Sequence, residues 1–262
     1  PVRVSLPAPP LTVSAPSPPL TESLPAPATI ESAPAPPDRV DAAEPPRIVS
    51  ASGLDVPCTA FGYHFVERQV PHSTGLHCLL EPGGLPYRTG PLARMSLFHD
   101  RLPPVARRAA DACGLDRACR DPFRSILVRL VEIAAAFEEA ARIARDCRAA
   151  AVPCRIDVRP RAGVGSHAVE APRGLLYHRY EIGADGLIAA ASIVPPTSQN
   201  QASIEADLLA LLPGILHLPE PEVARRCEHL IRSYDPCISC AAHFLALTVD
   251  RSPAGPCRPP AS

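Results

Sequence analysis

Proline is distributed unevenly along this chain of 262 residues, and the distribution divides it into a Pro-rich start and a remainder of ordinary composition. Residues 1–46 hold 14 of the 35 prolines and contain no glycine, cysteine or aromatic residue. Each proline fixes φ and removes a backbone donor, so closely spaced prolines disfavour helices and strands. Without aromatic residues, the segment cannot bury enough apolar surface to offset the entropy lost on ordering. We therefore predict that residues 1–46 are disordered.

The charge and apolar patterns narrow the class of protein. The 26 basic residues are all arginine and stand against 27 acidic residues, which leaves a net charge of −1. This balance lacks the basic excess that is typical of nucleic-acid binding. No apolar run approaches the ~20 residues that span a bilayer, and no secretory signal is recognisable. We expect a cytoplasmic protein with no membrane span and no nucleic-acid partner. Ten cysteines in a chain of this length favour reduced thiols, some of them metal ligands, over a disulfide scaffold.

Three regions show clear periodicity. Asp121 is a good N-cap before Pro122, and apolar residues then recur at helical spacing, which predicts a helix that ends near Ala150. The apolar face of this helix would be exposed unless another chain covers it. Two apolar runs, 175–182 and 187–194, flank a four-residue turn with two glycines and predict a β-hairpin. The patterns of residues 203–212 and 222–234 predict two more helices, the second with Val223, Cys227, Leu230 and Ile231 inward.

The clearest local motif is a pair of cysteines at the end of the last predicted helix. Cys237 and Cys240 are three residues apart, so both thiolates can reach one metal ion, and thiolates suit zinc, nickel and iron. A haem attachment site would need a histidine directly after the second cysteine, whereas here it is His243. A structural zinc site remains an alternative, with Cys227 and His229 as further ligands.

Two more segments carry polar groups in constrained surroundings. Arg173 lies between Pro172 and Gly174 just before the predicted hairpin, and a rigidly held guanidinium is suited to binding an anion or polar ligand. After the hairpin, Thr197 begins a run of polar residues beside a double proline, which indicates a shaped loop. An ordinary surface arginine and a simple strand-to-helix connection are the plainer interpretations of these segments.

Five segments, taken in order, resemble the C-terminal half of a [NiFe] hydrogenase large subunit. The similarity extends roughly from Phe61 to Leu245. The sequence VPPTSQNQ is most similar to the corresponding segment of cytosolic multisubunit enzymes that exchange electrons with NAD(P). The five segments are YRTGPLAR, DPFRSILVRLVE, EAPRGLLYHRYEI, IVPPTSQNQASIEADL and DPCISCAAHFL.

The resemblance implies a role for several residues. Cys237 would be the terminal nickel ligand, and Cys240 the thiolate that bridges nickel and iron, the iron also carrying carbon monoxide and cyanide. Arg173 would lie over the open metal position, and Thr197 would donate to a cyanide. His243 would help to bind a magnesium or iron ion. Glu170 and His178 would belong to the supporting polar network without a chemical step.

The resemblance also implies an architecture and partners. Large subunits of this family are mainly α-helical with small β elements (α+β), around a helical-bundle core. We expect a partial large-subunit domain over residues 47–243, and a C-terminal extension, 244–262, removed by a maturation endopeptidase. The partners would be NAD(P)-linked diaphorase subunits and an iron–sulfur small subunit.

One part of the family pattern is missing. The family carries a second cysteine pair, R-x-C-G-x-C, in its N-terminal half, and this chain has only the pair Cys237 and Cys240. Two thiolates cannot hold the bimetallic centre alone. We therefore expect that the N-terminal half is missing, through a fragment, a frameshift or a remnant gene. The alternative function is a non-catalytic zinc-binding or remnant structural subunit on the same scaffold.

Overall fold

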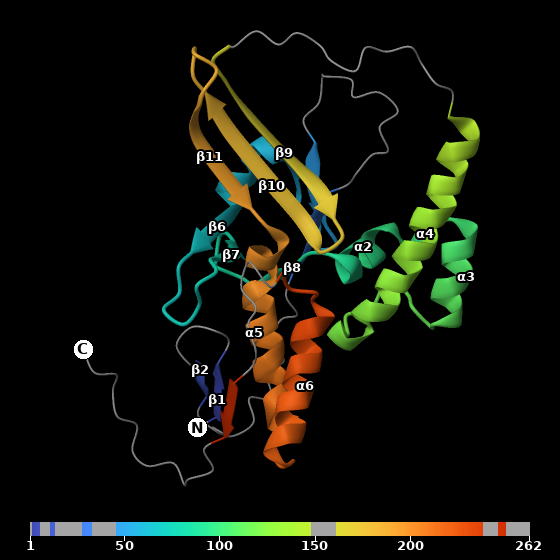
Figure 1. Cartoon of the computed structure of the whole chain (residues 1–262), viewed down its shortest axis with the longest axis vertical. Helices are drawn as coiled ribbons and strands as arrows, with labels where there is room; N and C mark the ends of the chain where they lie inside the picture. Colours follow the sequence, from blue (N-terminus) through green and yellow to red (C-terminus); the bar gives the residue numbers. More distant parts are fainter. Residues whose placement is uncertain are drawn as a thin grey trace. The chain divides into compact units, whose positions relative to one another are not determined.

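The computed structural model describes residues 46–147 and 161–237 in full, together with the backbone of four short strands in the terminal segments (Figure 1). The chain divides into two compact units. The first unit comprises residues 1–28, 65–88 and 197–262, and the second comprises residues 29–64 and 89–196.

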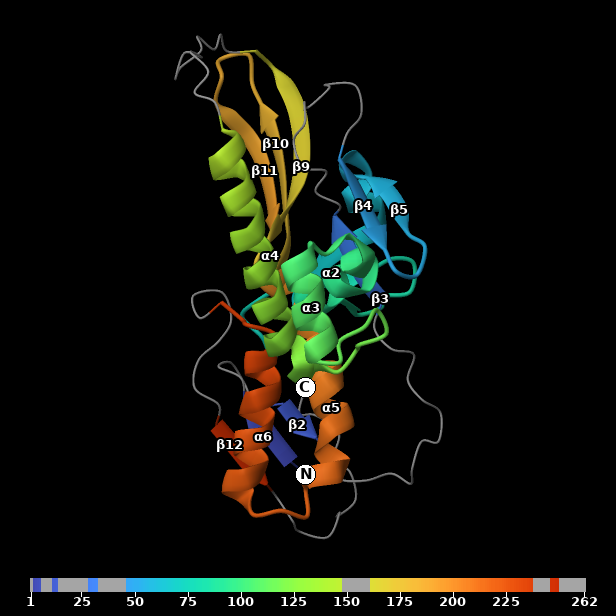
Figure 2. The same cartoon turned by 90° about the vertical axis from the view of Figure 1, so that its right-hand side faces the viewer.

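Two helices form the core of the first unit. Helices α5 (Pro196–Ile215) and α6 (Glu220–Ser233) lie side by side in both views (Figures 1 and 2). Leu208 and Leu212 of α5 pack in one buried cluster with Cys227 and Leu230 of α6. The prediction for α6 is confirmed, including the four inward residues, all of which are buried.

The start of α5 corrects a prediction. The sequence indicated a shaped loop over residues 195–200 and a helix only from 203, but the helix begins at Pro196. Proline at the first helical position costs no hydrogen bond, and its φ already suits a helix, so a double proline can begin a helix as readily as it can form a loop. Residues 197–201 therefore lie in the first turns of α5, and all five are buried.

Small antiparallel sheets complete the first unit. Strand β6 (Phe65–Arg68) pairs with β7 (His77–Leu80), and a short strand, β8 (Tyr87–Arg88), follows. Strand β1 (Val2–Ser5) lies between β2 (Leu11–Val13) and β12 (Ala246–Val249). Strands β1 and β2 occupy stretches without proline, and so does β3 (Ala28–Ser32), which pairs with β4 (Arg47–Ser50) of the second unit. Most other residues of the Pro-rich segment lie outside the described residues, where disorder stays a prediction.

Three helices form the core of the second unit: α2 (Pro91–Phe98), α3 (Pro104–Ala112) and α4 (Ser125–Asp146). Met95, Ala110 and Val128 contribute one residue from each helix to a buried cluster. The predicted long helix is confirmed. Its N-terminal turn is a short 3-10 helix, Pro122–Arg124, and the Asp121 carboxylate accepts a hydrogen bond of 3.0 Å from the backbone N–H of Phe123.

Helix α4 has a second apolar face that points away from the core. Val128 and Val131 are buried against α2 and α3, whereas Leu130 is 56% exposed and Phe137 is 74% exposed. The exposed side chains follow one another at spacings of three and four, so they form one stripe. This α4 stripe consists of Ile126, Leu130, Ile133 and Phe137.

A three-stranded sheet, in the order β11–β10–β9, forms the other large part of the second unit. The predicted hairpin is confirmed as β10 (Gly174–Ile182) and β11 (Ile188–Val194). Strand β9 (Gly163–Ala171) was not predicted. Its first residues include two glycines and a serine, which have low β propensity, and pairing with β10 compensates for this. The remaining elements are β4 (Arg47–Ser50), β5 (Asp55–Pro57), η1 (Cys58–Ala60), α1 (Phe61–His64) and η2 (His99–Arg101).

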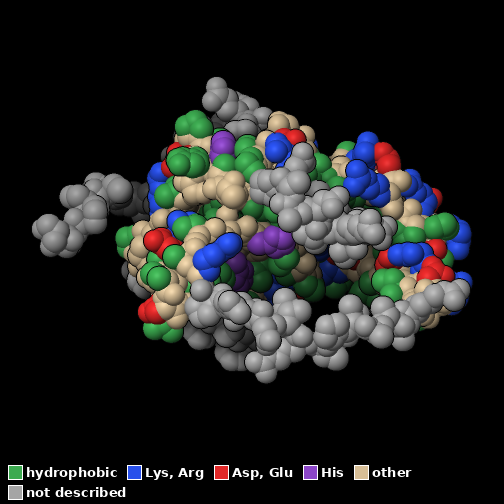
Figure 3. All heavy atoms as spheres, turned by 90° about the horizontal axis from the view of Figure 1, so that it is seen from above, with side chains coloured by type: hydrophobic (Ala, Val, Ile, Leu, Met, Phe, Trp, Pro, Cys, Tyr) green, Lys and Arg blue, Asp and Glu red, His purple; other side chains and the backbone are tan. Residues whose placement is uncertain are grey.

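The surface carries intermixed charges. On the face in Figure 3, arginine and acidic side chains lie beside one another. Many of them form ion pairs, such as Arg142 with Glu139 at 2.6 Å on α4. No helix within the described ranges is long and apolar enough to cross a bilayer. The described part is an α+β structure, in which helices are accompanied by small sheets, in line with the expected fold class.

Candidate metal centre

The structure brings together two of the predicted site residues. Thr197 lies in the first turn of α5 and is buried, and Cys237 follows α6. The backbone N–H of Cys237 donates a hydrogen bond of 3.4 Å to Oγ1 of Thr197. Between α6 and the cysteine, Asp235 has a left-handed φ of 51°, which turns the chain at the end of the helix. The first turn of α5 is thus hydrogen-bonded to the segment that follows α6.

A buried cluster of three side chains fixes the end of α6. Arg88 forms an ion pair of 2.6 Å with Asp207, and the hydroxyl of Tyr234 donates to the same carboxylate oxygen at 2.5 Å. The Arg88 guanidinium also lies 5.2 Å from the centre of the Tyr234 ring. Burial and the neighbouring carboxylate raise the pKa of Tyr234, so the hydroxyl remains a donor. Tyr234 precedes Cys237 by three residues. The cluster therefore fixes the position of the chain just before the cysteine.

Two serines attach the polar side of α5 to the strands of the first unit. Ser203 Oγ donates to the backbone carbonyl of Tyr87 at 2.7 Å. Ser198 Oγ lies 2.8 Å from the carbonyl of Leu76 and 2.9 Å from Oε1 of Glu67. These contacts place the start of α5, and with it Thr197, in a defined position.

Arg173 belongs to the second unit, where it lies in the two-residue turn between β9 and β10. Its side chain is exposed, and its backbone carbonyl approaches Gly90 so closely that a Cβ on Gly90 would lie 2.7 Å from it. Gly90 has a φ of 102° and Gly174 a φ of 135°. Both positions therefore require glycine for the turn to adopt this geometry.

Arg94 supports the same turn, a role that was not predicted for this side chain. Its guanidinium donates to Glu170 at 2.7 Å and to the backbone carbonyls of Ala171 and Pro172, both at 3.0 Å. It also forms a bidentate pair with Glu132 on α4, at 2.6 and 2.9 Å. Burial would lower the pKa of Arg94, but the two carboxylates outweigh this and raise it. Glu170 thus belongs to a polar network within the second unit, while its role beside a metal centre stays a prediction.

His178 makes a different contact from Glu170. Its Nδ1 lies 2.9 Å from the hydroxyl of Tyr180 on the same strand. Cys240 and His243 lie outside the described residues, so the structure gives no position for them. Their place in a metal centre stays a prediction.

The other cysteines of the first unit are poor candidates for metal ligands. Cys227 is buried between α5 and α6, and burial raises the pKa of its thiol to about 11. Burial likewise raises the pKa of Cys78 to about 12, and Tyr87 donates a hydrogen bond of 3.1 Å to its sulfur. Both thiols lie in apolar or hydrogen-bonded surroundings, and neither belongs to a group of three or more candidate ligands among the described residues. Among the described cysteines of this unit, Cys237 alone remains as a ligand candidate, so four thiolates cannot come from these residues.

Comparison with known proteins finds a family match in the second half of the chain. Residues 123–243 match the family described as Nickel-dependent hydrogenase. This part of the chain is similar to that family. The matched range contains four of the predicted site residues, Arg173, Thr197, Cys237 and Cys240. The proposed resemblance to [NiFe] hydrogenase large subunits is confirmed.

Individual relatives agree with the family. The chain is 34% identical over 177 residues to the A subunit of the F420-non-reducing hydrogenase of Methanothermobacter marburgensis, with 63% of this chain and 36% of the relative aligned. It is 26% identical over 201 residues to the alpha subunit of sulfhydrogenase 1 of Pyrococcus furiosus, with 76% and 46% aligned. A crystal structure of an NAD+-reducing [NiFe]-hydrogenase in the H2-reduced state superposes with a TM-score of 0.62 at 26% identity, over 83% of this chain and 51% of that one. The chain therefore spans about half or less of each nickel-dependent hydrogenase subunit that it matches.

Proposed function

We propose that this chain forms the C-terminal portion of the catalytic subunit of a [NiFe] hydrogenase, which oxidises H2 reversibly to protons and electrons. The hydrogen bond between Cys237 N–H and Thr197 Oγ1 is the main support. It links two segments, 40 positions apart, that both lie in the matched region. Contacts of this kind are expected where one motif supplies a metal ligand and another fixes its orientation.

In this proposal, Cys237 and Cys240 bind nickel and iron through their thiolates. When bound, the nickel–iron centre, whose iron carries carbon monoxide and cyanide, supplies the cleavage of H2. Thr197 holds the backbone of Cys237 and donates to a cyanide. Arg173 presents its guanidinium from a turn that is fixed on its backbone side by Arg94. His243 contributes to a magnesium or iron site.

The chain needs further components for this activity. Two more thiolates must come from an R-x-C-G-x-C segment that the 262 residues do not contain. Electrons would leave through an iron–sulfur small subunit. NAD(P)-linked diaphorase subunits are proposed as later acceptors, in line with the NAD+-reducing hydrogenase that the chain resembles. A maturation endopeptidase would remove residues 244–262.

A zinc-binding module built on the last cysteine pair finds less support. That alternative used Cys227 and His229 as additional ligands. Cys227 packs among apolar side chains with a raised thiol pKa, while His229 lies on a different side of α6 and is exposed. A cysteine and a histidine two residues apart on one helix point to different faces, so they do not converge on one ion.

Metal content and activity test the proposal. The full chain is expressed with its partner subunits and with a polypeptide that supplies the R-x-C-G-x-C thiolates. The purified complex is analysed for nickel, iron and zinc and for H2-dependent reduction of a viologen dye. The variant Cys237→Ser is expected to lose nickel and activity, and the matched variant Cys147→Ser, at an exposed cysteine, is expected to keep both. Zinc in place of nickel in the unaltered complex, or equal activity of the two variants, would overturn the proposal.

A further inference from the structure

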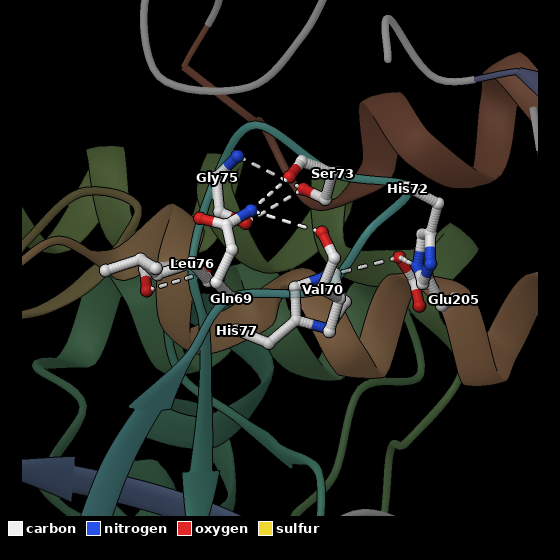
Figure 4. A network of polar contacts seen from close by, with 9 residues as sticks. Gln69, Val70, His72, Ser73, Gly75, Leu76, His77 and Glu205 are labelled. Carbon is white, nitrogen blue, oxygen red and sulfur yellow. Dashed lines mark hydrogen bonds and ion pairs between the residues drawn. The ribbon is translucent and has the colours of Figure 1, made fainter. Parts of the chain in front are cut away.

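Two histidines and a glutamate from distant parts of the first unit converge beside α5 (Figure 4). His72 lies in the loop between β6 and β7, His77 is the first residue of β7, and Glu205 projects from α5. One ligand atom from each residue lies within 4.8 Å of the others. His72 Nε2 is 2.9 Å from Oε1 of Glu205, and His77 Nε2 is 3.3 Å from the same oxygen.

These distances match the spacing of ligands around a small cation. Ligand atoms bound tetrahedrally at about 2.0–2.1 Å lie roughly 3.3 Å from one another. The two separations from Glu205 Oε1 are close to this value. Two imidazoles and one carboxylate are also a ligand set that zinc accepts, with a fourth position left open for water.

Burial distinguishes the cluster from an exposed ion pair. The side chain of His77 is only 6% exposed, and its buried Nε2 lies 3.3 Å from Glu205 Oε1 but makes no hydrogen bond with the geometry required, to this oxygen or to another described atom. Glu205 is 16% exposed. A buried imidazole nitrogen directed at a carboxylate without a hydrogen bond is a costly arrangement unless something binds there.

The loop that carries His72 is held in place without any ligand. The side-chain amide of Gln69 donates to the carbonyls of Val70 and Ser73, at 3.1 and 2.6 Å. Ser73 Oγ donates to the carbonyl of Gly75 and accepts from its N–H, at 2.9 and 3.1 Å. Figure 4 shows these bonds along the loop between the two histidines. A loop fixed in this way lowers the entropy lost on binding an ion.

We propose that His72, His77 and Glu205 form a binding site for a divalent transition-metal ion, with zinc as the ion that the ligand set suits best. The ion fastens the loop of residues 69–76 to α5. It is bound by three protein ligands and keeps one position for water. None of the three residues belongs to the proposed nickel–iron site, and the metal site does not depend on the hydrogenase activity.

Zinc binding to the full chain tests the proposal. The experiment uses the variant Cys237→Ser/Cys240→Ser, so that the cysteine pair cannot bind the ion. After chelation and dialysis, isothermal titration with Zn²⁺ is expected to give one ion per chain and a higher melting temperature. Co²⁺ as a probe is expected to give a visible spectrum without sulfur-to-metal bands.

Three substitutions in this background identify the ligands. Glu205→Gln and His72→Asn are each expected to weaken zinc binding at least about tenfold, since even residues outside the ligand set often contribute that much. His217→Asn, at an exposed position of the same unit, is expected to leave the affinity unchanged. His72 is 29% exposed, so its replacement should fold, which circular dichroism checks. Absence of zinc binding in the chain without the cysteine pair, or equal affinity of all three variants, would overturn the site.

Discussion

Arg94 and Glu132 form a bidentate ion pair between α2 and α4, with N–O distances of 2.6 and 2.9 Å. The same guanidinium reaches Glu170 and two carbonyls of the turn that carries Arg173. One arginine therefore joins two helices to a strand turn. The ion pair between Arg94 and Glu170 is largely shielded from solvent, because the Arg94 side chain is 14% exposed and that of Glu170 only 8%.

Removal of Arg94 should destabilise the second unit strongly. The variant Arg94→Ala deprives the buried Glu170 carboxylate of this ion pair, and we expect a loss of about 3 kcal/mol in the free energy of unfolding. Arg142→Ala breaks an exposed pair on α4 and should have a much smaller effect, because solvent screens that pair. Urea unfolding of the full chain compares the two variants. Equal losses would show that the Arg94 network does not hold the unit together.

The hydroxyl of Tyr234 should stabilise the end of α6. Tyr234→Phe removes the donor to Asp207 and is expected to lower the free energy of unfolding by about 2 kcal/mol, as for a hydrogen bond to a charged group. Tyr63→Phe is the control, because Tyr63 is 85% exposed. Thermal unfolding of the full chain gives the comparison. A melting temperature for Tyr234→Phe equal to that of the control would contradict this role.

Thiol reactivity should separate Cys78 from Cys147. With its pKa raised to about 12, the Cys78 thiol is ionised in roughly one molecule in 10⁴ at about pH 8, and it is also buried. Cys147 is exposed and should react with iodoacetamide much sooner, as mass spectrometry can follow. Since the pKa in the folded state exceeds the usual thiol value of 9.0, the stability linked to Cys78 is complete below about pH 9 and is lost as pH rises toward 12. Rapid alkylation of Cys78 in the folded chain would refute the prediction.

The α4 stripe should promote self-association of the isolated chain. Ile133 and Phe137 expose 51% and 74% of their surface, and apolar patches of this kind are usually covered by a partner. We expect Ile133→Glu/Phe137→Glu to reduce light scattering of the purified chain. For a control matched in charge, Phe137→Glu alone is compared with Ala136→Glu, which adds the same single charge at an exposed residue off the stripe. If both variants scatter light equally, charge rather than the stripe governs association.

Local signals predicted the elements whose pattern is continuous in the sequence. Asp121 and Pro122 marked the start of the long helix, and two apolar runs around a turn marked β10 and β11. The same kind of signal failed at Pro196, because proline is compatible with both a loop and a first helical turn. Strand β9 was missed since small residues give no strand pattern and its pairing partner lies later in the chain.

Contacts between residues that are far apart in the chain were not predicted from the sequence. Arg94, Glu132 and Glu170 are widely separated, and no spacing rule connects them. His72 and His77 are spaced as H-x4-H, which falls within the spacing of zinc ligands, but their third partner, Glu205, comes from α5 and no spacing connects it to them. The resemblance named Thr197 and Cys237, while their direct contact became visible only in the fold.

Gly90 bears on how loss-of-function variants of this chain should be interpreted. Every replacement at this position adds a Cβ that collides with the Arg173 carbonyl and must adopt a φ of 102°. In the proposed enzyme, a substitution of Gly90 is therefore expected to lower activity by distorting the turn, without changing a metal ligand or a charged group. A screen that equates lost activity with a damaged metal site would misclassify such a variant, and a conformational assay of the variant would correct the assignment.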